Sequence, residues 1–149
     1  MFRNILIPTD GSKLAAKGIK AGVKLAKALG ARVSGLYVIF PYVSPFYTEG
    51  AIYYVPGMSA QESRKVYEKQ ARKALALLER EAARARVRCR TSFVTAGQPW
   101  QAILRAARSQ RCDAIVMASH GRGGIGGLIL GSETTRVLAN SRLPVVVVR

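Results

Sequence analysis

Short apolar runs alternate with stretches of helical periodicity along the chain, and this alternation restricts the fold more than any other feature. The runs at residues 5–8 and 114–118 are apolar throughout and end at turn residues. Such runs are typical of strands buried on both faces of a parallel sheet, whereas apolar residues spaced three and four apart indicate helices. The whole sequence predicts strands at residues 5–8, 32–40, 87–94, 114–118 and 144–148, with helices beginning near residues 12, 61, 99 and 132.

Residues at the expected helix boundaries agree with this pattern. Ser12 is a candidate N-cap, Gly30 a candidate C-cap, and Pro99 stands where a helix can begin. Strands that alternate with helices wind by right-handed crossovers into a parallel sheet. We therefore predict an α/β fold, an open doubly wound five-stranded parallel sheet with helices on both faces. The length of 149 residues fits one domain spanning residues 1–149.

The chain is strongly basic. It has 24 lysines and arginines against 8 acidic residues, a formal net charge of +16. This balance favours polyanionic partners, such as nucleotides or nucleic acid, without choosing between them. The lysines from Lys13 to Lys27 recur every three or four residues, which predicts a solvent-exposed stripe on the first helix.

Neither a membrane span nor a secretory signal is evident. The apolar run at residues 144–148 is far too short to cross a bilayer, and the first residues lead straight into a strand. We expect a cytoplasmic protein without membrane insertion. Cys89 and Cys112 fit neither a zinc spacing nor a disulfide framework, and we expect both to be buried or half-buried.

Two segments of unusual composition follow predicted strands, at the sheet edge where ligands of such folds bind. One is residues 8–12. The other, residues 119–132, has six glycines from Gly121 to Gly131, with Arg122 among them and Ser132 entering a helix. Glycines expose backbone amides, and a helix N-terminus adds positive partial charge, so this segment suits a phosphate. A flexible surface loop with Ser132 as an ordinary N-cap is the alternative.

Known phosphate-loop motifs are absent. The sequence has no Gly-x-x-x-x-Gly-Lys-Ser/Thr, which excludes a Walker-type NTPase. The dinucleotide fingerprint belongs after the first strand, where only Gly11 stands, so NAD is disfavoured.

The sequence resembles the universal stress protein family over nearly its whole length. The likeness rests on residues 5–12, the Gly97-x-Pro99 turn, residues 112–121 and the ending at residues 143–148. The ATP-binding branch of that family has a motif of Gly, two residues, Gly, nine residues, then Gly and Ser or Thr. Gly121, nine residues and then Gly131-Ser132 match this motif, and Ala118 replaces its first glycine.

The resemblance implies a Rossmann-like fold of the adenine nucleotide alpha hydrolase type that binds ATP. By this likeness, Pro8, Thr9 and Asp10 would border adenine and ribose, and the Val38 backbone would contact the adenine edge. Ala118 adds a methyl group at the ribose side of the pocket. We expect the phosphates at Gly121, Gly131 and Ser132, with Arg122 nearby, and Mg²⁺ or Mn²⁺ carried by the nucleotide with Asp10 as a weak candidate ligand.

No catalytic constellation is evident. His120 is the only histidine, Asp113 opens a strand, and Glu133 suits the first turn of a helix. We expect no ATP hydrolysis, or slow hydrolysis only, and a role as a nucleotide-responsive stress or regulatory protein with a protein partner still to be identified. The alternatives are a basic nucleic-acid-binding module that does not depend on nucleotide, and an ATP-using enzyme such as a ligase.

Two further expectations concern contacts between molecules. The family resemblance implies a homodimer through the last strand, Val145 to Val148, whose β-branched residues make a poor unpaired edge. The aromatic-rich connection at residues 41–60 is expected to pad a subunit contact or pack over the sheet edge, with covering a ligand as the alternative.

Overall fold

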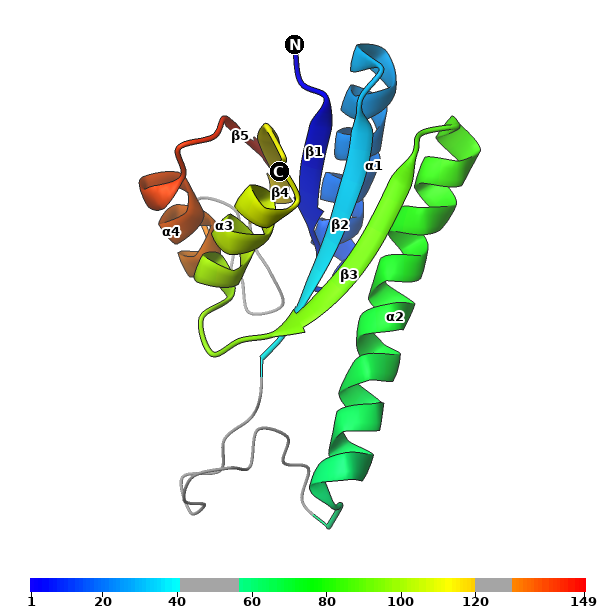
Figure 1. Cartoon of the computed structure of the whole chain (residues 1–149), viewed down its shortest axis with the longest axis vertical. Coiled ribbons are helices and arrows are strands. Elements are labelled where there is room, and N and C mark those ends of the chain that lie inside the picture. Colours follow the sequence, from blue (N-terminus) through cyan, green and yellow to red (C-terminus); the bar gives the residue numbers. More distant parts are fainter. Residues whose placement is uncertain (41–56, 120–129) are drawn as a thin grey trace.

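A computed structural model describes residues 1–40, 57–119 and 130–149 of the protein. In these ranges five parallel strands form one sheet, and four helices cover its two faces (Figure 1). The predicted doubly wound α/β fold is confirmed. The elements are β1 (Asn4–Pro8), α1 (Lys13–Leu29), β2 (Arg32–Ile39), α2 (Ala60–Ala85), β3 (Cys89–Thr95), α3 (Pro99–Ser109), β4 (Ala114–Ala118), α4 (Ser132–Asn140) and β5 (Val145–Val148).

The strand order is β3-β2-β1-β4-β5, and every neighbouring pair is parallel. The chain moves outward from β1 to β2 and β3, and then returns to the other side of β1 to form β4 and β5. The order therefore reverses between β1 and β4. In sheets of this kind a ligand site opens at that point, beyond the carboxyl ends of the strands.

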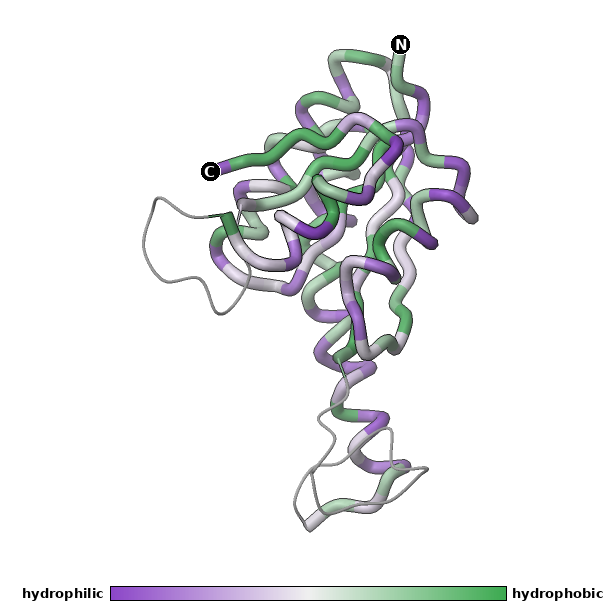
Figure 2. The backbone as a smooth tube through the Cα atoms, turned by 90° about the vertical axis from the view of Figure 1, so that its left-hand side faces the viewer, coloured by the Kyte–Doolittle hydropathy of each residue, from purple (hydrophilic) through white to green (hydrophobic). Residues whose placement is uncertain are grey.

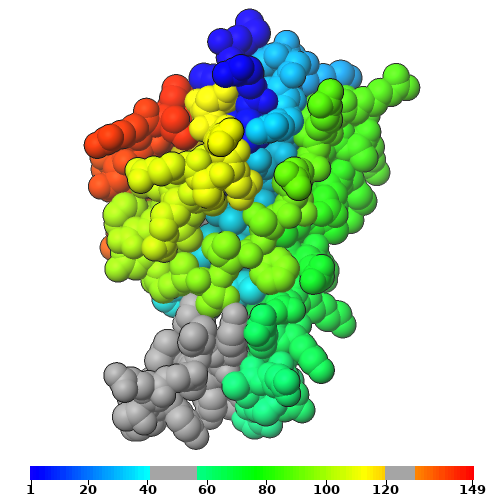
Figure 3. Space-filling view, viewed as in Figure 1, coloured from blue at the N-terminus to red at the C-terminus, as the bar shows by residue number. Residues whose placement is uncertain are grey.

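Side chains on β1 alternate between two apolar layers. Ile5 and Ile7 pack with α1 and α2 on one face, while Leu6 packs with α3 on the other, and all three are fully buried. Atoms of α3 and of the turn leading to β4, yellow-green to yellow in Figure 3, cover much of the face turned toward the viewer. Burial on both faces explains why these strands are apolar throughout.

The expected caps fix both ends of α1. The Ser12 hydroxyl accepts the Ala15 N–H group at 3.0 Å, and Gly30 has a left-handed φ of 65°. Strand β3 begins at Cys89, two residues later than predicted, because the Val87 N–H group still completes the end of α2 with the Ala82 carbonyl. The lysines of α1 are exposed, as predicted.

An edge strand and a projecting helix are the features of the fold that bear on its possible partners. Strand β5 lies at one edge of the sheet, and its apolar tube in Figure 2 ends at the polar C-terminal residue. Helix α2 projects beyond the sheet in Figure 1. None of the helices in the described part of the chain is both long and apolar enough to span a membrane.

Candidate functional site

A cavity of about 470 Å³ opens at the carboxyl ends of β1, β2 and β4, and we call it the carboxyl-edge cavity. Its size suits a small organic ligand. Residues from all four helices complete its walls. The lining comprises Pro8, Thr9, Asp10, Ala15, Leu36, Tyr37, Val38, Ile39, Phe40, Tyr67, Gln70, Pro99, Ile103, Met117, Ala118, Gly131, Ser132, Glu133 and Thr134.

The structure brings most of the predicted site residues together in this cavity. Its lining includes Pro8, Thr9, Asp10, Val38, Ala118, Gly131 and Ser132. The predicted residues Gly121 and Arg122 lie outside the described residues, as do His120 and the segment 41–56.

Sequence reasoning missed the aromatic and amide side chains of the lining. Tyr37 and Phe40 belong to β2 or follow it directly, so the strand that supplies Val38 was a signal for them. Tyr67 and Gln70 come from α2. Nothing in the local pattern of α2 distinguishes these two from other residues of that helix.

A hydrogen-bonded turn joins β1 to α1 at the cavity. The Thr9 N–H group donates to the Leu36 carbonyl at 2.9 Å, and the buried Thr9 hydroxyl accepts the Gly11 N–H group at 3.2 Å. One carboxylate oxygen of Asp10 accepts the Ser12 N–H group at 2.9 Å. Asp10 therefore holds the turn just before the N-cap of α1, and this contact fixes its place in the lining.

The backbone of Val38 faces the cavity. Peptide groups along a strand point alternately to its two neighbours, and the Leu36 carbonyl already bonds on the β1 side, to Thr9. Val38 follows Leu36 by two residues, so its N–H and C=O groups also point to the β1 side of the strand. Strand β1 has ended at Pro8, which leaves this position open to the cavity.

Ala118 packs closely against α1. A Cβ atom placed on Gly18 would lie 3.6 Å from the Ala118 Cβ and 3.1 Å from the Ala118 backbone nitrogen. Gly18 therefore allows α1 to approach β4 closely at this point. The alanine is 8% exposed, so little of its surface is open to the cavity that it lines.

Hydrogen bonds attach the start of α4 to the end of β4. The Gly131 N–H group donates to the Ser119 carbonyl at 2.8 Å, and the buried Thr134 hydroxyl donates to the Ala118 carbonyl at 3.0 Å. The N-cap is Gly131, in an extended conformation, and Ser132 is the first helical residue. The interpretation of Ser132 as the N-cap is therefore wrong. The first turn of α4, whose N–H groups have no partner within the helix, opens on the cavity.

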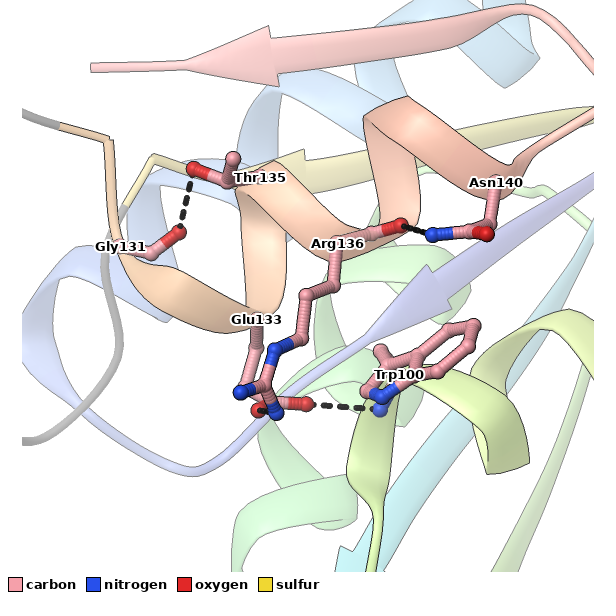
Figure 4. A network of polar contacts seen from close by, with 6 residues as sticks. All are labelled: Trp100, Gly131, Glu133, Thr135, Arg136 and Asn140. Atoms are coloured by element: carbon pink, nitrogen blue, oxygen red, sulfur yellow. Dashed lines mark hydrogen bonds and ion pairs between the residues drawn. The ribbon is translucent and has the colours of Figure 1, made fainter.

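Glu133 links the first turns of α3 and α4 (Figure 4). Its carboxylate accepts the backbone N–H group of Trp100 at 2.7 Å and lies 3.6 Å from the Arg136 guanidinium. Within the same turn, the Thr135 hydroxyl donates to the Gly131 carbonyl at 3.1 Å. Two helix N-termini with positive partial charge therefore stabilise this carboxylate at the cavity.

Asp113 and the cysteines have structural positions. The Asp113 carboxylate accepts the N–H groups of Arg3 and Asn4 at 2.8 and 3.0 Å. Both cysteines are free, Cys112 buried and Cys89 half-buried, as predicted. Burial raises the pKa of the Cys89 thiol to about 11, and burial also raises the pKa of Cys112. Neither thiol is set up as a nucleophile.

Sequence comparison connects the whole chain to known proteins. Residues 1–149 match the model of the universal stress protein family. The chain is 34% identical to universal stress protein YxiE of Bacillus subtilis and 32% identical to a universal stress protein of Thermus aquaticus, over the full length of each pair.

Solved structures share the fold. Protein MJ0577, a universal stress protein of Methanocaldococcus jannaschii, superimposes with a TM-score of 0.76 at 26% identity, covering 99% of this chain and 96% of that one. A universal stress protein in complex with cAMP has a TM-score of 0.71 at 21% identity, with 99% and 97% covered. An Arabidopsis thaliana family protein with AMP bound has 0.67 at 13%, with 98% and 90% covered. The matching family model and these full-length relatives show that the chain belongs to the universal stress protein family.

Proposed function

We propose that the carboxyl-edge cavity binds ATP, accompanied by Mg²⁺ or Mn²⁺ on its phosphates, and that the protein is a nucleotide-responsive regulator in the cytoplasm. One observation carries the proposal. The open peptide groups of Val38 and the free first turn of α4 border a single cavity of about 470 Å³. An adenine edge and a phosphate chain require these two kinds of group.

The adenine is assigned to the β2 side of the cavity. The N–H and C=O groups of Val38 offer a donor and an acceptor, which match the ring nitrogen and the exocyclic amine of adenine. The side chains of Ile103 and Met117 supply apolar surface in the same lining. Most small-molecule sites combine apolar walls with a few fixed polar groups in this way.

The phosphates are assigned to the α4 side. The N-terminus of α4 offers unpaired N–H groups and positive partial charge. Ser132 is exposed there and adds a hydroxyl group. The hydrogen bond between Gly131 and Ser119 joins the residues that flank the glycine-rich segment, and we assign Gly121 and Arg122 of that segment to the phosphates as well.

The described lining favours binding over turnover. Its carboxylates are Asp10, which accepts a turn N–H group, and Glu133, which accepts the Trp100 N–H group. A general base needs a carboxylate directed at the attacking water. We therefore propose no hydrolysis, or slow hydrolysis only, and a metal ion held mainly by the nucleotide's own phosphates.

Relatives support the choice of an adenine nucleotide. Proteins with this fold were solved in complex with cAMP, with dAMP and with AMP. The shared base of these ligands is consistent with an adenine site at Val38. The triphosphate is our extension of this support, and it rests on the glycine-rich segment and on the start of α4.

The protein's assembly is part of the same proposal. We propose that residues 1–149 form one domain, and that two copies pair through β5. This strand is an edge of the sheet, and Val146 on it is 39% exposed. An unprotected apolar edge strand favours pairing with a second strand.

Calorimetric titration of nucleotide-stripped protein with Mg-ATP tests the site. In a Ser132→Glu variant the new carboxylate suits the helix N-terminus, so α4 stays folded, but it repels the phosphates. Gln61→Glu is the matched control, because it adds the same charge to the exposed first turn of α2, outside the cavity lining. We expect saturable binding to wild type, at least tenfold weaker binding to Ser132→Glu, and little change in the control. Absence of binding to wild type, or equal loss in both variants, would refute the site.

A further inference from the structure

The basic residues that the structure describes lie outside the lining of the carboxyl-edge cavity. Among the described residues of that lining there is no lysine or arginine, whereas Asp10 and Glu133 are present. A second cavity, of about 340 Å³, lies at the opposite end of the sheet, and we call it the amino-edge cavity. Five of its eight lining residues are basic: Arg3, Lys27, Arg32, Arg86 and Arg88.

The fold itself brings these cations together. The Arg32 N–H group donates to the Arg3 carbonyl at 3.0 Å, and the Val33 N–H group donates to the Arg88 carbonyl at 2.8 Å. Three arginines therefore stand at the adjacent starts of β1, β2 and β3. Helices α1 and α2 end at the same edge, at the top of Figure 1, and supply the other two cations. Blue, light blue and green atoms from these segments lie along the top of Figure 3.

These cations have no carboxylate partners in the described ranges. The ion pairs found there involve other residues, and all five basic side chains are exposed. Asp113 is at the same edge, but its two oxygens accept the N–H groups of Arg3 and Asn4. The five cations of the amino-edge cavity therefore outnumber the one carboxylate nearby, and the cavity carries an excess of positive charge.

The end of α2 places Arg86 at the cavity. Helices α1 and α2 both end with a left-handed residue, which is Gly30 in α1 and Arg86, with φ 56°, in α2. Glycine is the favoured residue at such a position. The cap N–H groups already bond to the last carbonyls of each helix, so arginine is not needed there to close α2. Arg86 therefore has a backbone conformation that is less favourable for arginine than for glycine, and its side chain places a positive charge at the cavity.

We propose that the amino-edge cavity binds an extended chain of phosphate groups. Single-stranded nucleic acid and inorganic polyphosphate both present such a chain, and the cavity recognises the phosphates and not the bases. The other lining residues are Gly30, Ala31 and Val87, whose side chains cannot form hydrogen bonds with a base. Five long exposed cations spread around an open cavity suit an extended polyanion better than one compact phosphate. This inference does not rest on ATP binding at the other edge.

The test measures fluorescence anisotropy of a labelled oligothymidylate as a function of salt concentration, with nucleotide-stripped protein and without divalent cations. Five phosphate contacts on a single strand predict a slope of log K against log salt of about −3.5. In the triple variant Arg32→Gln, Arg86→Gln, Arg88→Gln, two contacts remain and the slope should be about −1.4. Circular dichroism checks that the variant is folded.

A control variant separates a built site from general attraction to a basic protein. Lys17→Gln, Lys65→Gln, Lys69→Gln removes the same charge from exposed positions outside both cavities, and it should keep the wild-type slope. Equal loss of slope in the two triple variants would overturn the proposal. So would a wild-type slope corresponding to fewer than about two phosphates.

Competition distinguishes the two sources of phosphate. Unlabelled polyphosphate and unlabelled oligothymidylate are added at equal phosphate concentration. Displacement by both supports recognition of phosphate alone, and the tighter competitor identifies the preferred source. Displacement by oligothymidylate only would mean that bases are read, and would overturn the proposal as stated.

Discussion

Replacing Glu133 tests how the two helix N-termini at the carboxyl-edge cavity are stabilised. The carboxylate accepts the Trp100 N–H group at 2.7 Å and pairs with Arg136 at 3.6 Å. In a Glu133→Gln variant the side-chain shape and one acceptor oxygen are kept, but the charge is lost. In Glu133→Ala the half-buried Trp100 N–H group has no acceptor.

The expected loss of stability follows from these contacts. A hydrogen bond to a charged acceptor contributes about 1 kcal/mol more than a neutral one. A carboxylate in the first turn of a helix adds about 0.3–1 kcal/mol. Glu133→Gln should therefore lower the free energy of unfolding by about 1–2 kcal/mol, and Glu133→Ala by about 2–3 kcal/mol. For a chain of this length, 1.5 kcal/mol corresponds to a fall in Tm of about 5 °C.

Urea denaturation followed by circular dichroism measures these changes, and Arg136→Gln is the control. The Arg136 side chain is 57% exposed, and exposed pairs contribute only about 0–1 kcal/mol, so Arg136→Gln should change stability by less than about 0.5 kcal/mol. Equal losses in Arg136→Gln and Glu133→Gln would mean that the ion pair, rather than the bond to Trp100, supplies the stability. No loss in Glu133→Ala would refute the reasoning altogether.

The same variant bears on nucleotide binding. Glu133 places a negative charge in the cavity proposed to hold phosphates. Its removal should tighten binding of Mg-ATP roughly two- to fivefold, because one repulsive interaction of about 0.5–1 kcal/mol disappears. A less stable protein that binds ATP more tightly is a combination that general damage to the fold does not produce. Weaker binding to Glu133→Gln in calorimetry would contradict the placement of the phosphates at α4.

Three further predictions concern other parts of the fold. Ala118→Gly should lower the free energy of unfolding by about 1–2 kcal/mol, because the contact with α1 at Gly18 is lost, but it should change the affinity for Mg-ATP by less than about twofold. A larger gain in Mg-ATP affinity, measured by calorimetry, would mean that the methyl group obstructs the cavity. The pKa of Cys89 is raised to about 11, so its thiol stays neutral and should resist alkylation at pH 8 in the folded protein, as should the thiol of Cys112, whereas both should react in urea. The contribution of the neutral Cys89 thiol to the free energy of unfolding is present below pH 9 and is lost as the pH rises through 11. Arg111 has a left-handed φ of 53°, so Arg111→Gly should raise the free energy of unfolding by about 0.5–1 kcal/mol, measured as a rise in Tm of about 2–3 °C. A fall in Tm would mean that the arginine side chain stabilises the protein by more than its backbone conformation costs.

The sequence predicted the fold well because its signals were local. Buried parallel strands must be apolar throughout, and caps such as Ser12 and Gly30 bond to their own helix. Pro8 and Ser132 stood at an expected strand end and helix start, whereas Val38 was selected by the family resemblance, and the topology brings all three to one cavity.

Contacts between distant segments could not be predicted in the same way. Tyr67 and Gln70 line the carboxyl-edge cavity because α2 packs over β2 and β3 at one angle, and no local pattern records that angle. The bond from Trp100 to Glu133 joins two helices that follow different strands. Glu133 was expected in a first turn, but its acceptance of an N–H group from another helix depends on tertiary packing.

The distribution of charge follows from the direction of the helices. In a doubly wound parallel sheet every crossover helix begins near the carboxyl edge and ends near the amino edge, so positive helix termini gather at one edge and negative termini at the other. Backbone groups at the carboxyl-edge cavity can therefore attract an anion although Asp10 and Glu133 line it. The amino edge would need only a few cations to offset its helix ends. Five basic residues around one cavity there exceed that need, and this excess is the physical basis for a second, separate polyanion site.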